Sequence, residues 1–223
     1  MRRFIPWAVA LFAVSFPTGA DSQDLADLDY DNLSFRGFGF EIGYLFPDRV
    51  EEATSYGIRF DLGYLGPGLR IVPSITYWSS PFQASEVSGL ETRVASLVQT
   101  QTGALPPTVD LGVIDWTDVA FSLDGHIVWE VPFDILTFAG LGLSAHILNG
   151  DGAAINGTFV EDLLDSVSAG FNLHAGVEYP VTDRLRLHSQ GRYEVLEDLQ
   201  FFHLKFGFQL MTGPNAPGEG PGF

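Results

Sequence analysis

Residues 167–179, which read VSAGFNLHAGVEY, decide the fold. The odd positions of this run, from Val167 to Tyr179, are all apolar or aromatic, whereas the even positions hold Ser, Gly, Asn, His and Glu. Side chains of a β-strand point alternately to its two faces, so this period of two indicates a strand with one apolar and one polar face. Since a tilted strand of about 9–11 residues crosses the hydrocarbon core of a bilayer, the run is long enough to be transmembrane.

The same alternation occurs in seven other segments. These are residues 37–46, 56–64, 69–77, 118–129, 140–147, 185–194 and 202–210. An even number of strands lets an antiparallel meander close without open edges, which a bilayer requires of any sheet. The sequence therefore predicts an all-β fold: an eight-stranded antiparallel up-and-down transmembrane β-barrel over residues 33–211.

The lengths of the connections support this topology. Short segments, 65–68, 130–134 and 180–184, alternate with long ones at 47–55, 79–114 and 149–165, and a last connection of moderate length follows at 196–200. Outer-membrane barrels have short periplasmic turns and longer outer loops, with both termini in the periplasm. A soluble sandwich gives no reason for its loops to be sorted in this way.

Which face of the strands is outside follows from side-chain size. A soluble, lipocalin-like barrel would turn the apolar set inward around a ligand. Phe38, Phe40, Phe206 and Phe208 would overfill so narrow a lumen, whereas the many glycines of the polar set suit a crowded interior. We therefore expect the apolar set to face lipid and the polar set to line the lumen.

This assignment predicts two groups of residues. The lumen is expected to be lined by Glu41, Arg59, Asp61, Arg70, Asp118, Asp124, His126, His146, His174, Glu178, Arg186, His188, Arg192, Glu194, His203 and Lys205. Two aromatic girdles at the membrane interfaces are expected to contain Tyr44, Phe46, Tyr56, Tyr64, Tyr77, Trp129, Tyr179 and Tyr193. Charges in the lumen must either pair with one another, which would plug the barrel, or stay wet.

The two ends of the chain lie outside the predicted barrel. Arg2 and Arg3 precede an apolar run that ends in small residues at 18–20, which is typical of a secretory signal peptide over residues 1–20. Residues 21–32 form an acidic arm, and residues 212–223 form a flexible tail rich in Pro and Gly. Export predicts a bacterial outer-membrane location after cleavage.

Composition excludes several classes of function. The formal net charge is −17, so clustered Lys and Arg for binding nucleic acid are missing. The sequence has no cysteine, which rules out disulfides, thiolate catalysis and a cysteine-anchored lipoprotein.

With its signal segment, eight alternating strands and alternating loop lengths, the chain resembles the small outer-membrane barrel families, including the OmpA transmembrane domain, OmpX and OmpW. The resemblance covers about residues 33–211. It implies the lipid bilayer as the environment. Residues 202–210, FHLKFGFQL, resemble the last-strand signal read by the barrel-assembly machinery, although here that strand does not end the protein.

We find little support for catalytic, metal or cofactor chemistry. His174 and His188 flank the 180–184 turn and are weak metal candidates, because no local ligand spacing supports them. The neighbouring His188 and Ser189 point to opposite faces of a strand, so the imidazole cannot reach that hydroxyl. No cofactor is expected, and an enzyme that modifies lipid A or phospholipid is the third hypothesis.

The main functional hypothesis is a structural or surface-interaction barrel, in which outer loops contact an unidentified partner. The alternative is a small pore, or an OmpW-like conduit for ions or small apolar molecules. Pro73 removes one hydrogen bond from a strand ladder and either weakens the wall there or marks a bulge. In the long 79–114 loop, residues 84–102 contain no proline and could form a short helix.

Overall fold

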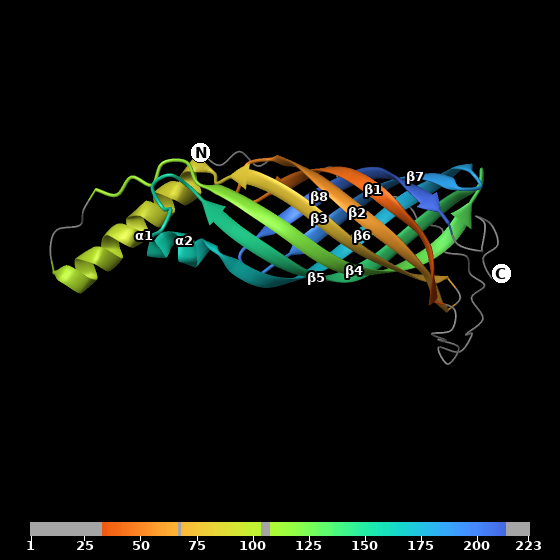
Figure 1. Ribbon diagram of the computed structural model, residues 1–223, viewed down its shortest axis with the longest axis horizontal. Helices are drawn as coiled ribbons and strands as arrows, with labels where there is room; N and C mark the ends of the chain where they lie inside the picture. Colours follow the sequence, from red (N-terminus) through yellow and green to blue (C-terminus); the bar gives the residue numbers. More distant parts are fainter. Residues whose placement is uncertain (1–32, 67, 104–107, 213–223) are drawn as a thin grey trace, which may run out of the picture.

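The computed structural model describes residues 33–66, 68–103 and 108–212. Eight antiparallel strands form a closed barrel in chain order, and β8 pairs with β1 to complete it (Figure 1). The strands are β1 (Leu33–Pro47), β2 (Ala53–Gly66), β3 (Leu69–Pro81), β4 (Asp115–Val131), β5 (Ile135–Asp151), β6 (Ser166–Thr182), β7 (Leu185–Val195) and β8 (Gln200–Met211). The predicted fold class is therefore confirmed. The predicted signal peptide, the acidic arm and all of the tail beyond Thr212 lie outside the described residues.

The barrel has two different ends. The connections β1–β2, β3–β4, β5–β6 and β7–β8 meet at one end, which we name the loop end. The shorter connections β2–β3, β4–β5 and β6–β7 meet at the other, which we name the turn end. The two helices of the described residues lie together at the loop end (Figure 1).

The helices have local causes in the sequence. α1 (Ala84–Thr102) lies in the segment that could form a helix, and it ends where Gly103 adopts a φ of 67° and donates its N–H to the Gln99 carbonyl. α2 (Phe159–Leu164) is capped at its N-terminus by Thr158, whose side chain accepts a hydrogen bond from the Val160 N–H. Among the described residues, neither helix is long and apolar enough to cross a membrane.

Pro73 lies beside a bulge. β3 pairs without interruption with β4, including Pro73 opposite Leu123. On the other side, the register with β2 shifts between Arg59 and Tyr64, so four residues of β2 face three of β3. Gly63 has a φ of 79°, which glycine adopts without steric penalty, so β2 accommodates the extra residue here. The sequence left open whether Pro73 weakens the barrel wall or marks a bulge, and the structure has a bulge beside it.

Candidate functional site: a polar lumen and a loop-end pocket

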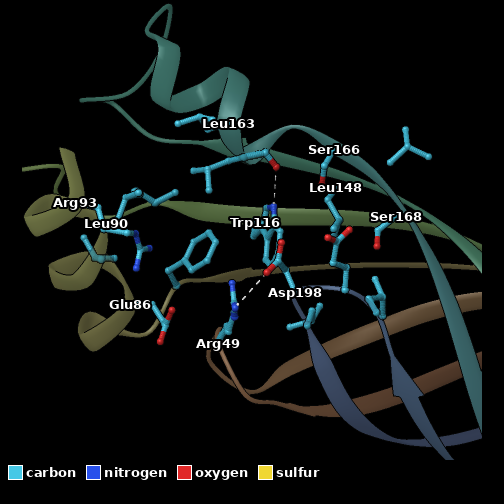
Figure 2. A pocket seen from close by; sticks show the side chains of 18 residues that line it. Arg49, Glu86, Leu90, Arg93, Trp116, Leu148, Leu163, Ser166, Ser168 and Asp198 are labelled. Carbon is cyan, nitrogen blue, oxygen red and sulfur yellow. Dashed lines mark hydrogen bonds and ion pairs between the residues drawn. The ribbon is translucent and has the colours of Figure 1, made fainter. Parts of the chain in front are cut away.

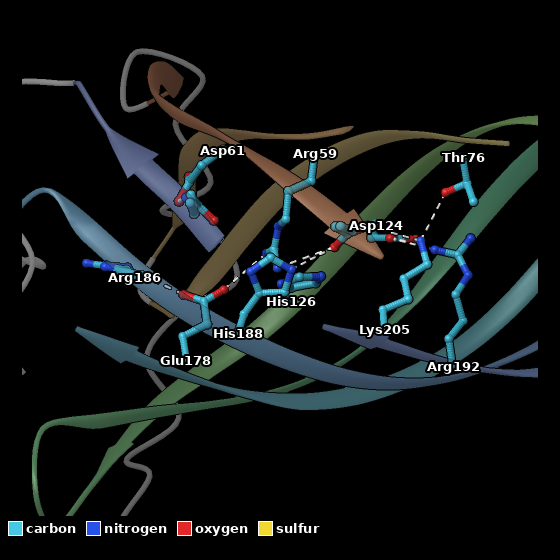
Figure 3. A network of polar contacts seen from close by, with 12 residues as sticks. Arg59, Asp61, Thr76, Asp124, His126, Glu178, Arg186, His188, Arg192 and Lys205 are labelled. Atoms are coloured by element: carbon cyan, nitrogen blue, oxygen red, sulfur yellow. Dashed lines mark hydrogen bonds and ion pairs between the residues drawn. The ribbon is translucent and has the colours of Figure 1, made fainter. Parts of the chain in front are cut away.

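Every residue that the sequence assigned to the lumen is buried, and none is more than 7% exposed. Since the strands form a single closed sheet, their inward side chains meet inside the barrel. Most of these residues form one network of ion pairs and hydrogen bonds (Figure 3).

Glu178 is the centre of the network nearer the turn end. Its carboxylate lies 2.6 Å from Arg70, 3.1 Å from Arg59 and 3.5 Å from Arg186. Asp61 adds a second carboxylate 3.7 Å from Arg70. One carboxylate thus holds three guanidinium groups from three different strands, so the walls of the barrel are joined across its interior (Figure 3).

Two further carboxylates extend the network through the middle of the barrel. Glu41 accepts hydrogen bonds from His188 Nε2 at 2.9 Å and from Lys205 Nζ at 3.2 Å. Asp124 accepts a hydrogen bond from Arg192 at 2.9 Å. The contacts of Glu41 with His188 and of Asp124 with Arg192 join strands that are not neighbours in the sheet.

Nearer the loop end, Asp118, His146 and Ser144 have the order of a hydrolase triad. His146 Nδ1 lies 2.7 Å from Asp118, and its Nε2 lies 3.0 Å from Ser144 Oγ. Ser144, however, donates its own proton to Glu194 and therefore accepts from His146. Both nitrogens of His146 then act as donors, so this imidazole cannot take the Ser144 proton as a general base.

We did not predict this triad-like group from the sequence, because we considered only a Ser and a His that are adjacent in the chain. Ser144 and His146 are two positions apart on β5 and so share a face. Asp118 comes from the adjacent strand β4. The pattern that could have indicated this group is a Ser and a His two positions apart on one strand, with an inward-facing Asp on the adjacent strand.

The two weak metal candidates are not brought together. His188 is opposite Glu178 and His174 opposite Arg192, which puts the two histidines four positions apart along the β6–β7 ladder. His174 instead lies near His126 and Asp124, with potential ligand atoms within 4.8 Å of one another.

This second histidine group does not suit a metal ion in its present hydrogen bonding. The guanidinium of Arg70 donates to His126 Nδ1 at 3.1 Å, so His126 Nε2 carries the ring proton and has no lone pair to offer. The Arg192 guanidinium already binds Asp124. His126 packs instead on the Phe138 ring, with centroids 4.5 Å apart.

An apolar plug closes the lumen at the loop end. It is formed by inward side chains of the strands together with residues of the β1–β2 and β7–β8 connections. Its buried members are Leu45, Val50, Ala53, Trp78, Trp116, Leu148, Leu196, Leu199 and Phe201. Below the plug, a cavity of about 10 Å³ between His146 and Arg192 has room for roughly one water molecule.

The outer surface of the barrel is strongly apolar. Of the predicted girdle residues, Tyr44, Phe46, Tyr56, Tyr77, Tyr179 and Tyr193 are between 42% and 58% exposed. Trp129 is partly exposed.

Tyr64 differs from the prediction that it faces lipid. It pairs with Arg70, whose side chain is buried inside the barrel, and paired residues share a face of the sheet. The Arg36 guanidinium lies 5.1 Å from the centre of its ring. The bulge at Gly63 reverses the alternation at this point, and the sequence pattern did not reveal that extra residue.

A pocket of about 250 Å³ opens at the loop end, between the helices and the rim of the barrel (Figure 2). Its apolar wall includes Leu90 of α1, Leu163 of α2, and Trp116 and Leu148 of the strands. Its charged residues are Arg49, Glu86, Arg93, Glu197 and Asp198. The sequence did not predict this pocket, because its walls come from segments far apart in the chain.

Comparison with known proteins places the fold. No protein-family model and no curated protein matches the chain. Among solved structures, it is similar to Neisserial surface protein A, with a TM-score of 0.54 and 13% identity over 79% of this chain and 96% of that one. It is also similar to Ail, the attachment invasion locus protein of Yersinia pestis, with a TM-score of 0.48 and 10% identity over 81% and 99% of the two chains.

A third similar structure is a major outer membrane protein from Thermus thermophilus. It has a TM-score of 0.48 and 10% identity, with coverage of 79% of this chain and 98% of that chain. The expected resemblance to small outer-membrane barrels is confirmed at the level of the fold.

Proposed function

We propose that this protein is an outer-membrane barrel with a sealed lumen, which acts as a structural or surface-interaction protein and presents its loop end to the cell exterior. The observation that carries the proposal is the combination of the apolar plug and the paired lumen beneath it. An ion would have to pass both to cross the barrel. The strongly apolar outer wall supports insertion in lipid.

Charge balance supports the sealed state. Among the predicted lumen residues, six carboxylates face five Lys and Arg side chains, and each of these groups except Asp118 has a partner of opposite sign within 4.0 Å. Asp118, the remaining carboxylate, lies 2.7 Å from Nδ1 of His146. A low-dielectric interior favours such pairing over isolated charge.

The two alternative functions have weaker support. A pore needs a wet path, and a lateral conduit needs a gap in the wall, yet the β3–β4 ladder runs through Pro73 without interruption and the β2–β3 ladder resumes at Tyr64 and Arg70 after the bulge. An enzyme needs a free base next to the nucleophile, and His146 already donates towards Ser144. We therefore favour a non-catalytic role.

The orientation can be tested by labelling single cysteines, because the natural sequence has none. Ser96→Cys places a thiol on exposed α1 at the loop end, and Asp183→Cys places one on the exposed turn between β6 and β7. In intact cells, a membrane-impermeant maleimide should label Ser96→Cys and leave Asp183→Cys unmodified until the cells are opened. Equal labelling of both in opened cells is the control, and labelling of Asp183→Cys alone in intact cells would contradict the orientation.

A further inference from the structure

The loop-end pocket is assembled from α1, α2, the strand ends and the β7–β8 connection. Trp116 forms its floor, and the Trp116 Nε1–H donates to the Leu164 carbonyl at 3.1 Å, which ties α2 to the barrel (Figure 2). Its volume of about 250 Å³ is below the ~300–1,000 Å³ usual for small-molecule sites. The pocket is better matched to a single large apolar side chain.

An exposed apolar ridge continues from the pocket. Phe159 and Leu163 lie one turn apart on α2 and are 53% and 63% exposed, and Leu163 also lines the pocket. A central apolar anchor site with a polar surround is the usual anatomy of a protein-binding hot spot. The pocket and this ridge together have that arrangement.

The charge around the pocket is strongly negative. In the described segments 48–52, 82–103, 108–115, 151–165 and 196–199, the only cationic side chains are Arg49 and Arg93. The acidic side chains of the same segments are Asp48, Glu51, Glu52, Glu86, Glu91, Asp110, Asp115, Asp151, Glu161, Asp162, Asp165, Glu197 and Asp198. Such a field attracts cationic partners and repels anionic ones.

The two arginines do not reverse this field. Arg49 already pairs with Asp198 at 3.3 Å, and this leaves Arg93 beside Glu86 and Glu197 in the lining of the pocket. The lining itself therefore carries more negative than positive charge. An acyl chain with a carboxylate or phosphate head would have to enter against the charge of the whole loop end.

We propose that the loop-end pocket is a docking site for a basic peptide or protein segment, which inserts one large apolar side chain between α1 and α2 while its Lys and Arg residues meet the acidic rim. This inference rests on the proposed surface-interaction role and names the chemistry of the partner. Apolar burial supplies the anchor, and the acidic rim selects a cationic sequence and speeds its association.

The test uses the full-length mature protein in nanodiscs of zwitterionic phosphatidylcholine, so that the lipid carries no net charge. Isothermal titration calorimetry compares a short lysine-rich peptide containing a single phenylalanine with two matched peptides. One replaces the phenylalanine by alanine, and the other replaces the lysines by glutamate. The phenylalanine peptide should bind about tenfold or more tightly than the alanine peptide, and the glutamate peptide should not bind.

Matched variants locate the binding. Leu163→Ser removes an exposed apolar wall of the pocket and should weaken binding about three- to tenfold, whereas Leu97→Ser, at a 50% exposed position of α1 outside the lining, should not. Glu86→Gln/Glu197→Gln should weaken binding at low salt and reduce its salt dependence. Glu130→Gln/Asp183→Asn removes the same charge at the turn end and should change neither.

Three results would overturn the inference. Equal binding of the alanine and phenylalanine peptides would mean that the acidic surface attracts cations without using the pocket. Binding of decanoate in competition with the phenylalanine peptide would mean that the pocket takes an anionic amphiphile. If no peptide binds while Ser96→Cys is labelled on intact cells, the docking site is wrong and the surface orientation still stands.

Discussion

At the residue scale, Glu178 has the most concentrated set of contacts in the lumen. Its side chain is fully buried and faces Arg59, Arg70 and Arg186. A buried ion pair contributes little net stability compared with apolar residues, but removal of one partner leaves a charge without compensation. Glu178 is the extreme case, because three guanidinium groups lie within 3.5 Å of its carboxylate.

Glu178→Gln should therefore destabilise the barrel by about 3–5 kcal/mol, although the change preserves the shape of the side chain. Urea unfolding of the refolded protein in detergent, followed by tryptophan fluorescence, measures the loss. Asp183→Asn, at the exposed turn after the same strand, is the control and should change stability by about 0.5 kcal/mol or less. A loss of under about 1 kcal/mol for Glu178→Gln would mean that water, and not Glu178, compensates the arginines.

Gly142 shows how tightly the lumen is filled. A Cβ atom added there would overlap the carboxylate of Asp124 and the amide of Asn172. Gly125, on the opposite face of the neighbouring strand, would bring a Cβ no closer than 3.8 Å to its nearest neighbours.

We expect Gly142→Ala to lower the free energy of unfolding by about 1–3 kcal/mol and Gly125→Ala to leave it almost unchanged. The same urea titration distinguishes the two variants. Equal stabilities would indicate a wider, hydrated lumen around Asp124.

At the scale of elements, the alternation in the sequence predicted which side chains point inward but not which of them meet. The contacts depend on register, and register depends on each turn. His174 and His188 flank the 180–184 turn almost symmetrically and so could be cross-strand neighbours by sequence alone, whereas in the structure Glu178 lies opposite His188. A shift of this kind moves every cross-strand neighbour and so changes the whole network.

The alternation in the sequence also did not predict where the strands begin and end. β4 and β5 each extend for 17 residues, which is longer than the alternating runs 118–129 and 140–147. Trp116 and Leu148 occupy inward positions that the pattern assigns to polar residues. The plug needs apolar side chains there. Polar and apolar residues therefore stop alternating where the inward side chains form the plug and no longer form ion pairs.

α1 is an insertion in a hairpin that is otherwise continuous. The β3–β4 ladder extends to the pair Pro81 and Asp115, directly below the loop that contains the helix. Val94 of α1 belongs to one buried apolar cluster with Leu111, Ile114, Ile155 and Val160, and Val87 and Leu90 of the same helix pack against this cluster.

Replacement of residues 84–102 by a short Gly/Ser linker should therefore leave the barrel able to fold, since longer or shorter surface loops change the free energy of closure only slightly. The variant should keep the shift in electrophoretic mobility between heated and unheated samples that is expected of the wild type, and it should lose binding of the phenylalanine peptide. Failure to refold would contradict the view that α1 serves the pocket and not the barrel.

At the scale of the whole molecule, the chain is a closed barrel whose interior is filled by a polar network and by an apolar plug. Ion pairs cross the lumen in the middle and at the turn end, and the apolar plug covers them at the loop end. The sequence predicted the closed wall and named the lumen charges, but it left open whether they pair or stay wet. The structure pairs them, and for this reason we favour a surface role over transport.

The most direct test of the sealed lumen is the conductance of the refolded wild-type barrel in a planar lipid bilayer. We predict that the folded protein, verified by its change in mobility on heating, inserts without discrete conductance steps. Reproducible steps whose ion selectivity changes in Lys205→Glu would contradict it, because they would place the lumen charges on a conduction path.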